Sequence, residues 1–216
     1  MKAAGNVSFF VEWVLGHTLA FYPSNILSAQ IGRYVSIAIW PGFPDPPVRA
    51  VAIIVSALVE GIFYGLAIGI IQYIILARHG VNVKGWAFDS AAGWGVGLML
   101  SALAGVPKQP FVAGAFATLG EVSGIGLAAG LQSRRLQAFA PSARRWWLTY
   151  PAAWLIAVIF AGILQTIIQV TAANRIGGLT VPLILAGISG DFVFGIISGR
   201  SLMRIVPLLS TAQKRS

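Results

Sequence analysis

Long apolar stretches, separated by short polar turns, make up most of the chain. About 20 apolar residues in helical conformation cross the hydrocarbon core of a bilayer, which is roughly 30 Å thick. Five stretches reach this length, and they run approximately over Ala50–Leu76, Trp86–Val106, Pro110–Leu131, Trp147–Ala172 and Pro182–Val206. The pattern therefore predicts an all-α fold in which each stretch is one membrane-spanning helix.

The N-terminal apolar region, residues 8–40, is longer than one span and contains Pro23. Proline lacks a backbone N–H and bends or ends a helix. We therefore expect a membrane helix over Ser8–Tyr22, a break or bend near Pro23 and then an amphipathic or interfacial segment to Trp40. With this helix included, the chain is predicted to be a polytopic membrane bundle of about six transmembrane helices. The proline-rich residues 41–47 are the clearest interruption of the pattern.

The basic residues give an independent check on the number of helices. With six spans, eleven Lys and Arg residues fall on one side of the membrane and four on the other. The eleven are Lys2, Arg78, Lys84, Arg134, Arg135, Arg144, Arg145, Arg200, Arg204, Lys214 and Arg215, and the four are Arg33, Arg49, Lys108 and Arg175. Because Lys and Arg are enriched in cytoplasmic loops, we expect both termini to be cytoplasmic.

One pattern of polar and aromatic residues occurs twice, 60 residues apart. A glutamine near the end of one apolar stretch is followed by a basic turn and by two tryptophans at the start of the next stretch. The matched pairs are Gln72 and Gln132, Trp86 and Trp146, and Trp94 and Trp154. Because the two hairpins point the same way, they are predicted to be parallel repeats about an axis along the membrane normal.

A third copy of this hairpin is expected to be split between the two ends of the chain. Trp13 and Phe21 repeat the spacing of the two tryptophans, and Gly195 and Gly199 repeat a glycine spacing of the first hairpin. If the last helix packs beside the first, the bundle is a pseudo-threefold ring. We treat the chain as one membrane domain with four sections, residues 1–49, 50–109 (first hairpin), 110–176 (second hairpin) and 177–216.

Each repeated glutamine is predicted to register its hairpin through a hydrogen bond. Trp94 and Trp154 lie eight residues inside their helices, roughly 12 Å at 1.5 Å per residue, where an indole N–H needs an acceptor. Gln72 and Gln132 lie at a similar depth, and an amide oxygen accepts such a bond. We therefore expect interhelical clasps between Gln72 and Trp94 and between Gln132 and Trp154. In the split copy, Leu202 and Phe21 occupy the corresponding positions.

Glycines four residues apart predict close contacts between helices. Gly61, Gly65 and Gly69 lie on one face of the first stretch of the hairpin. Small residues at this spacing let membrane helices approach closely. A looser version, with Gly120 and Gly124, is present in the matching stretch of the second hairpin. We interpret both as ordinary helix packing.

Three acidic residues fall near the middle of helices that run in the same direction. They are Glu60, Glu121 and Asp191. Carboxylates inside a bilayer are costly and usually face the bundle interior or water, which makes them candidates for a functional site. They could line a cation or proton path or bind a cationic solute. The alternative is that each carboxyl is protonated or hydrogen-bonded to a neighbouring helix. Asp89 lies near the interface and is expected to be solvated.

Composition narrows the function classes further. Hydrophobic residues are 57% of the 216 residues and charged residues only 10%, against about 25% charged in soluble domains. The net charge of +9 would favour nucleic acid as a partner of a soluble protein. Here most bases lie at the ends of apolar stretches, where they contact lipid headgroups. We therefore expect the lipid bilayer, and no nucleic acid, as a partner.

The sequence offers little for catalysis, metals or cofactors. It has no Cys and only two His, His17 and His79, too few for a His-rich metal cluster. His17 could be an axial ligand of a haem or chlorophyll, but a single membrane His is more often a hydrogen-bonded core residue. No catalytic residue pair is in view. We expect no enzyme activity, no metal and no cofactor.

The repeated pattern resembles a known group. The motif Gly-x3-Gly-x2-Gln in GLAIGIIQ, a basic turn and Trp-x7-Trp in WAFDSAAGW resemble a functionally uncharacterised group of bacterial six-span membrane proteins with such hairpins in tandem. The resemblance covers about residues 50–204. The second hairpin departs from it, with Ile125 and Ala129 in place of glycine. The resemblance implies six spans and a bacterial cytoplasmic (inner) membrane, and it carries no activity over.

Two function classes remain. Short loops and glycine-rich faces lead us to expect a structural or interaction subunit of a membrane complex, with other membrane subunits as partners; the transporter component described next is the alternative. The acids and repeated hairpins favour a small-solute or cation-binding component of a transporter, whose ligand the sequence does not name. The two classes differ in whether Glu60, Glu121 and Asp191 meet at one cavity or face separate helix contacts.

Overall fold

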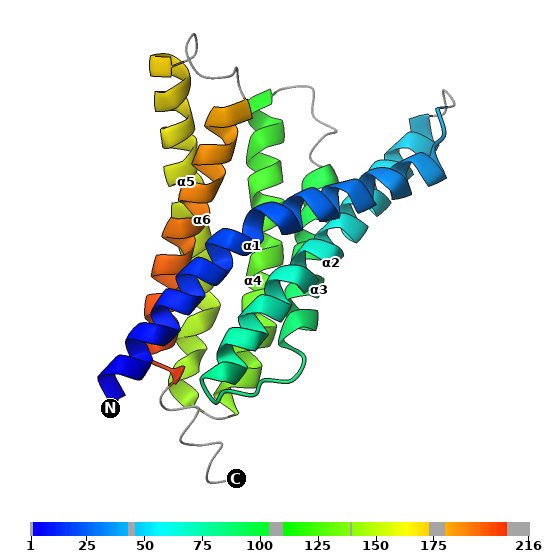
Figure 1. Cartoon of the computed structure of the whole chain (residues 1–216). Coiled ribbons are helices and arrows are strands. Elements are labelled where there is room, and N and C mark those ends of the chain that lie inside the picture. Colours follow the sequence, from blue (N-terminus) through cyan, green and yellow to red (C-terminus); the bar gives the residue numbers. More distant parts are fainter. Residues whose placement is uncertain (1, 43–45, 104–109, 139, 173–179, 207–216) are drawn as a thin grey trace.

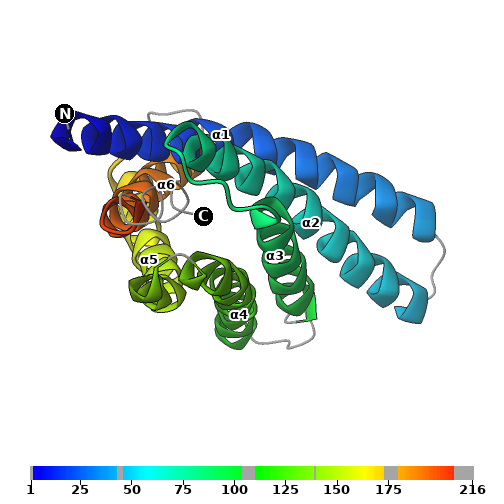
Figure 2. The ribbon, with the colours of Figure 1, turned by 90° about the horizontal axis from the view of Figure 1, so that it is seen from below.

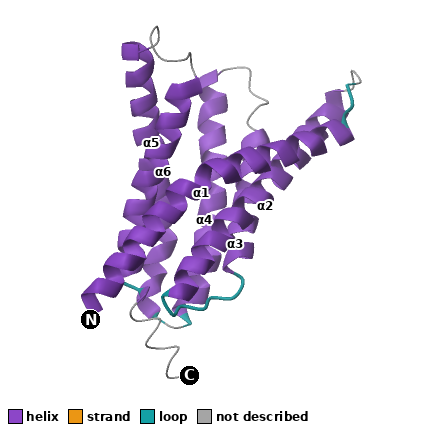
Figure 3. Ribbon diagram, in the orientation of Figure 1, coloured by secondary structure: helices purple, strands orange, loops and turns teal. Residues whose placement is uncertain are grey.

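The computed structural model describes residues 2–42, 46–103, 110–138, 140–172 and 180–206 (Figure 1). These residues form six α-helices and one short 3-10 helix, with no β-strand among them (Figure 3). The elements are α1 (Lys2–Ile39), α2 (Pro46–Arg78), α3 (Trp86–Leu103), α4 (Pro110–Gln137), η1 (Pro141–Arg145), α5 (Trp146–Ala172) and α6 (Thr180–Met203). The predicted all-α class is confirmed.

The six helices form a closed ring. Each helix packs against the next one in the chain, and α1 also packs against α6, which closes the ring (Figure 2). The expected contact between the last and the first helix is therefore present. The described chain begins and ends at the same end of the bundle, where the α2–α3 and α4–α5 connections also lie (Figure 1). We call this the basic end, because its turns and helix ends carry Arg78, Lys84, Arg134, Arg135, Arg144, Arg145, Arg200 and Arg204.

Apolar side chains cover much of the outside of the ring, whereas several polar side chains are buried inside it. Val7, Leu19, Ile163 and Val170 are exposed on α1 and α5, and Val170 is 81% exposed. The buried polar residues include His17, Gln72, Asp89, Gln132 and Ser198. Soluble proteins normally show the opposite distribution. Two helical stretches, Pro47–Arg78 and Pro141–Ile168, are long and apolar enough to cross a membrane by length and composition.

The predicted break near Pro23 is wrong, because α1 continues through it for 38 residues. Pro23 is exposed, whereas Ser24, Ser28 and Gly32 are buried. A Cβ at Gly32 would lie 3.2 Å from the carbonyl oxygen of Ser56 in α2. This packing against α2 on the far side of Pro23 offsets the hydrogen bond that proline removes. Tertiary contacts therefore keep the helix intact where the local sequence favours a bend.

The α2–α3 turn folds back into the bundle. Val81 and Val83 are both buried, with exposed fractions of 0% and 2%. Gly80 and Gly85 have φ values of 77° and 86°, which are easy for glycine alone. As a result α3 begins with a fully buried Trp86. The α4–α5 connection buries Ala140 and Ala143 in the same way, and α5 also begins with a fully buried tryptophan.

Candidate functional site

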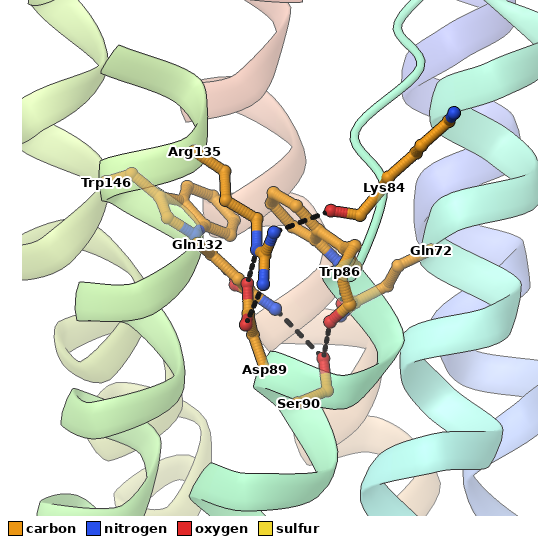
Figure 4. Close-up of polar contacts among 8 residues, drawn as sticks. All are labelled: Gln72, Lys84, Trp86, Asp89, Ser90, Gln132, Arg135 and Trp146. Carbon is orange, nitrogen blue, oxygen red and sulfur yellow. Dashed lines mark hydrogen bonds and ion pairs between the residues drawn. The ribbon is translucent and has the colours of Figure 1, made fainter. Parts of the chain in front are cut away.

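Both glutamines form the expected bonds between helices, but with other tryptophans. Gln72 Oε1 accepts a hydrogen bond from Trp86 Nε1 at 2.7 Å, and Gln132 Oε1 accepts one from Trp146 Nε1 at 3.0 Å (Figure 4). The predicted partners Trp94 and Trp154 were therefore wrong. The re-entrant turns bring the first tryptophan of each helix to the depth of the glutamine. The second tryptophan lies farther along, at the cavity described below.

A third tryptophan occupies the matching place in α1. Trp13 Nε1 donates to Ser198 Oγ at 3.0 Å, and Ser198 lies one turn before Leu202, which takes the place of glutamine. Trp13, Trp86 and Trp146 are all fully buried. The ring centroid of Trp146 lies 6.3 Å from that of Trp13 and 6.1 Å from that of Trp86. Three indoles thus fill the centre of the bundle near the basic end.

Asp89 is not solvated as expected, because it is 4% exposed and bound to Arg135 of α4. Arg135 Nη2 donates to Asp89 Oδ1 at 2.9 Å, its Nε donates to Oδ2, and its Nη1 donates to the Lys84 carbonyl at 2.8 Å (Figure 4). The hydrogen bond to Asp89 raises the pKa of Arg135. A Cβ at Gly85 would collide with the guanidinium. The pair ties α3 to α4 at the basic end.

A cavity of about 260 Å³ lies inside the ring and is lined by residues of all six helices. Glu60 of α2, Glu121 of α4 and Asp191 of α6 all line it. The structure therefore brings the three predicted acids to one site. Trp94 and Trp154 line the same cavity. Trp94 Nε1 has no hydrogen-bond partner among the described residues.

The cavity wall is acidic and aromatic. No Lys or Arg side chain lines it. The ion pairs in the described part of the chain involve the other acids, Glu12 and Asp89. Six aromatic residues line the cavity, namely Phe21, Tyr64, Trp94, Tyr150, Trp154 and Phe194. Aromatic faces and carboxylates both attract cations.

A hydrogen-bond network closes the inner end of the cavity, toward the basic end. Gln72 Nε2 lies 3.0 Å from Tyr150 Oη and 2.8 Å from His17 Nε2. Phe194 packs against both rings, with centroid distances of 5.0 Å to each. His17 is 2% exposed, and the interpretation of His17 as a hydrogen-bonded core residue is confirmed.

Sequence reasoning missed Tyr64 and Tyr150 as cavity residues. Tyr150 lies four residues after Trp146 and four before Trp154, so the three rings share one face of α5. That spacing could have identified Tyr150 as a residue on the same face as the two tryptophans. Tyr64 lies four residues after Glu60 on α2 in the same way. Neither tyrosine follows the 60-residue repeat, on which the sequence interpretation depended.

The described ranges contain no group of three or more His, Asp or Glu side chains that could hold one metal ion. The three acids share a cavity without converging on one point, which suits a ligand larger than a bare ion. Comparisons of the chain with protein-family models, with curated proteins and with solved structures find no match. The geometry of the cavity is therefore the guide to function.

Proposed function

We propose that the protein is a multi-pass membrane protein that binds a small cationic solute in its central cavity, as the solute-binding component of a transporter. The observation that carries the proposal is that Glu60, Glu121 and Asp191, from three helices, line one aromatic cavity that has no basic side chain. Acids inside a membrane protein are retained where they face water, a partner charge or a substrate. A cationic solute supplies the missing charge.

A membrane location of the ring fits this function. The outer surface is rich in exposed apolar residues, as a lipid-facing surface is. We propose six spans with the basic end in the cytoplasm, following the positive-inside rule, in a bacterial inner membrane. The three acids lie farther from the basic end than the buried hydrogen bonds do. Glu60, Glu121 and Asp191 precede Gln72, Gln132 and Ser198, respectively, along helices that run toward that end. The solute would thus enter from the outer side.

We also propose that the ring consists of three related hairpins. Two carry a glutamine-to-tryptophan bond, and in the split third hairpin Ser198 replaces glutamine as the acceptor. At the centre, the ring of Trp146 lies beside those of Trp13 and Trp86. Such symmetry would put a shared binding site on the axis of the bundle, where the repeats meet.

The structural-subunit hypothesis has less support. It explains the exposed apolar face, but contact with lipid explains that face equally well. It gives no reason for three acids without basic partners at one cavity, because a scaffold would avoid the cost of burying them. We therefore favour solute binding over a purely structural role.

Replacement of one acid tests the proposal. Tetramethylammonium binding is measured by calorimetry on the purified protein in mild detergent. We expect Glu121→Gln to weaken binding by about tenfold, the loss of one attraction of about 1.4 kcal/mol. Glu12→Gln is the matched control, since Glu12 lies outside the cavity beside His79. Equal binding by both variants and the parent, or no binding of cations by the parent, would contradict the proposal.

A further inference from the structure

The direction of each hydrogen bond at the inner end of the cavity is fixed by one tryptophan. An indole N–H only donates, so the Gln72 atom next to Trp86 Nε1 must be the amide oxygen (Figure 4). The Gln72 amide nitrogen then faces Tyr150 and His17. Because this nitrogen only donates, Tyr150 Oη and His17 Nε2 both act as acceptors.

This order leaves two donors for the cavity. Tyr150 accepts from Gln72, so its own O–H hydrogen is available, and no described residue accepts it. His17 accepts at Nε2, so its neutral ring carries the hydrogen on Nδ1. Both residues line the cavity, and Tyr150 is 1% exposed. The inner end of the cavity is therefore a wall of hydrogen-bond donors.

Tyr64 adds a third donor. It is 6% exposed, lines the cavity and has no hydrogen-bond partner among the described residues. Its ring packs edge-on against Trp94, with the centroids 4.7 Å apart. Its hydroxyl hydrogen is therefore available to an acceptor atom of a ligand.

We propose that the ligand carries two recognition groups, a cationic nitrogen and a hydrogen-bond acceptor oxygen. This inference rests on the proposed function and specifies its substrate class. The oxygen binds the donors Tyr150 and His17 at the inner end. The cation lies between the acids and the aromatic rings, nearer the outer end. Of the three cavity acids, Asp191 lies nearest to the inner end, because it precedes Phe194 by only three residues on α6 and Phe194 packs against His17 and Tyr150.

The cavity size limits the ligand. Its volume of about 260 Å³ is just below the range of roughly 300 to 1,000 Å³ of typical pockets for drug-sized molecules. The ligand is therefore a small metabolite, with one ring or a short chain between the two groups. Gln72 and Trp86 do not line the cavity. They act as positioning residues that set the direction of the donors.

Two matched cations test this assignment. N-methylpyridinium has the charge and an aromatic ring, and 3-acetyl-N-methylpyridinium adds one acceptor oxygen. We expect the parent protein to bind the acetyl compound about five- to tenfold more tightly, the effect of one hydrogen bond. Tyr150→Phe should reduce this preference to below about twofold, because it removes only the hydroxyl and keeps the ring.

The second hairpin supplies a control for the positioning role. Gln132 Nε2 donates to Ser90, and neither residue lines the cavity. Trp86→Phe frees the Gln72 amide to turn and should reduce the preference to below about twofold, whereas Trp146→Phe should leave it intact. Size-exclusion chromatography and circular dichroism confirm that each variant is folded.

The outcomes separate this inference from the proposed function. Equal affinity of the parent protein for the two cations would overturn the inference and leave cation binding standing. Retention of the preference in Tyr150→Phe would also overturn it. Failure of both cations to bind, together with tetramethylammonium, would contradict the proposed function itself.

Discussion

The hairpins α2–α3 and α4–α5 share the same glutamine-to-tryptophan bond but pack in different ways. In the first hairpin, glycines bring α2 against the backbone of α3. A Cβ at Gly65 would lie 2.5 Å from the Ser90 carbonyl oxygen, and one at Gly69 would lie 2.7 Å from the Ala87 Cα. In the second hairpin, Ile125 and Ala129 take these positions and are buried.

The glycines of α4 serve a different contact. They pack against α3. A Cβ at Gly120 would lie 2.6 Å from the backbone nitrogen of Ser101, and Gly124 packs against Gly97. Thus α4 approaches α3 more closely than it approaches α5, and α5 contributes five residues to the cavity wall. The two hairpins thus share the hydrogen bond between their helices and differ in where glycine allows backbones to touch. Glycine brings α2 against α3 and α3 against α4, but it does not bring α4 against α5, which lines the cavity.

The largest expected effect on stability comes from replacing Gly65 of the first hairpin by isoleucine, the residue at the matching position 125 of the second. Gly65→Ile places a branched side chain against the α3 backbone, which cannot move far. We expect a loss of about 3 kcal/mol or more of folding free energy, since overpacking against backbone is poorly relieved. Denaturant titration in detergent measures this loss. Gly126→Ile is the control, because nothing lies within 4 Å of a Cβ at Gly126. A similar loss in both variants would argue against the close contact.

Replacing the glutamine of each hairpin in turn is expected to have an intermediate effect on stability. Gln72→Leu leaves Trp86, Tyr150 and His17 without a partner, whereas Gln132→Leu affects Trp146 and Ser90. We expect losses of about 2–3 kcal/mol and about 1–2 kcal/mol, because each orphaned buried group costs energy. Thermal unfolding monitored by tryptophan fluorescence ranks the two. A larger loss for Gln132→Leu would contradict the central role of Gln72.

The smallest effect is expected at the open glycine of α4. Gly126→Ala adds a methyl group where space is free and removes the backbone entropy of glycine. We expect a gain of about 0.5–1 kcal/mol. The same denaturant titration measures the change. Loss of stability instead would show that another helix occupies this face.

The sequence predicted the class of fold and the acids of the site, but it misplaced several partners. The positions of Gln72 and Gln132 and the depth of the three acids follow from apolar stretches and helical rise alone. The partners of the glutamines were wrong because depth was counted from Trp86 and Trp146 as the outer ends of their helices. The burial of Val81 and Val83 in the turn instead places Trp86 inside the bundle. Local patterns do not reveal a turn that re-enters the bundle.

Contacts between distant residues were also out of reach. Asp89 meets Arg135 across 46 residues, and nothing near either residue indicates the pair. Pro23 favours a break locally, but the contact between Gly32 and α2 outweighs it. The donors at the inner end of the cavity depend on a chain of bonds from Trp86 through Gln72 to Tyr150. Such a chain becomes visible only when three helices, α2, α3 and α5, are placed together.

The length of α1 has a consequence for the lipid environment. Its 38 residues extend roughly 57 Å at 1.5 Å per residue, well beyond a hydrocarbon core of about 30 Å. In Figure 1, α1 and α2 lean together away from α4, α5 and α6. A long apolar helix matches a thinner bilayer by tilting further. In a membrane, bilayer thickness would therefore set the lean of this helix pair and, with it, the distance between Glu60 of α2 and Glu121 of α4 across the cavity.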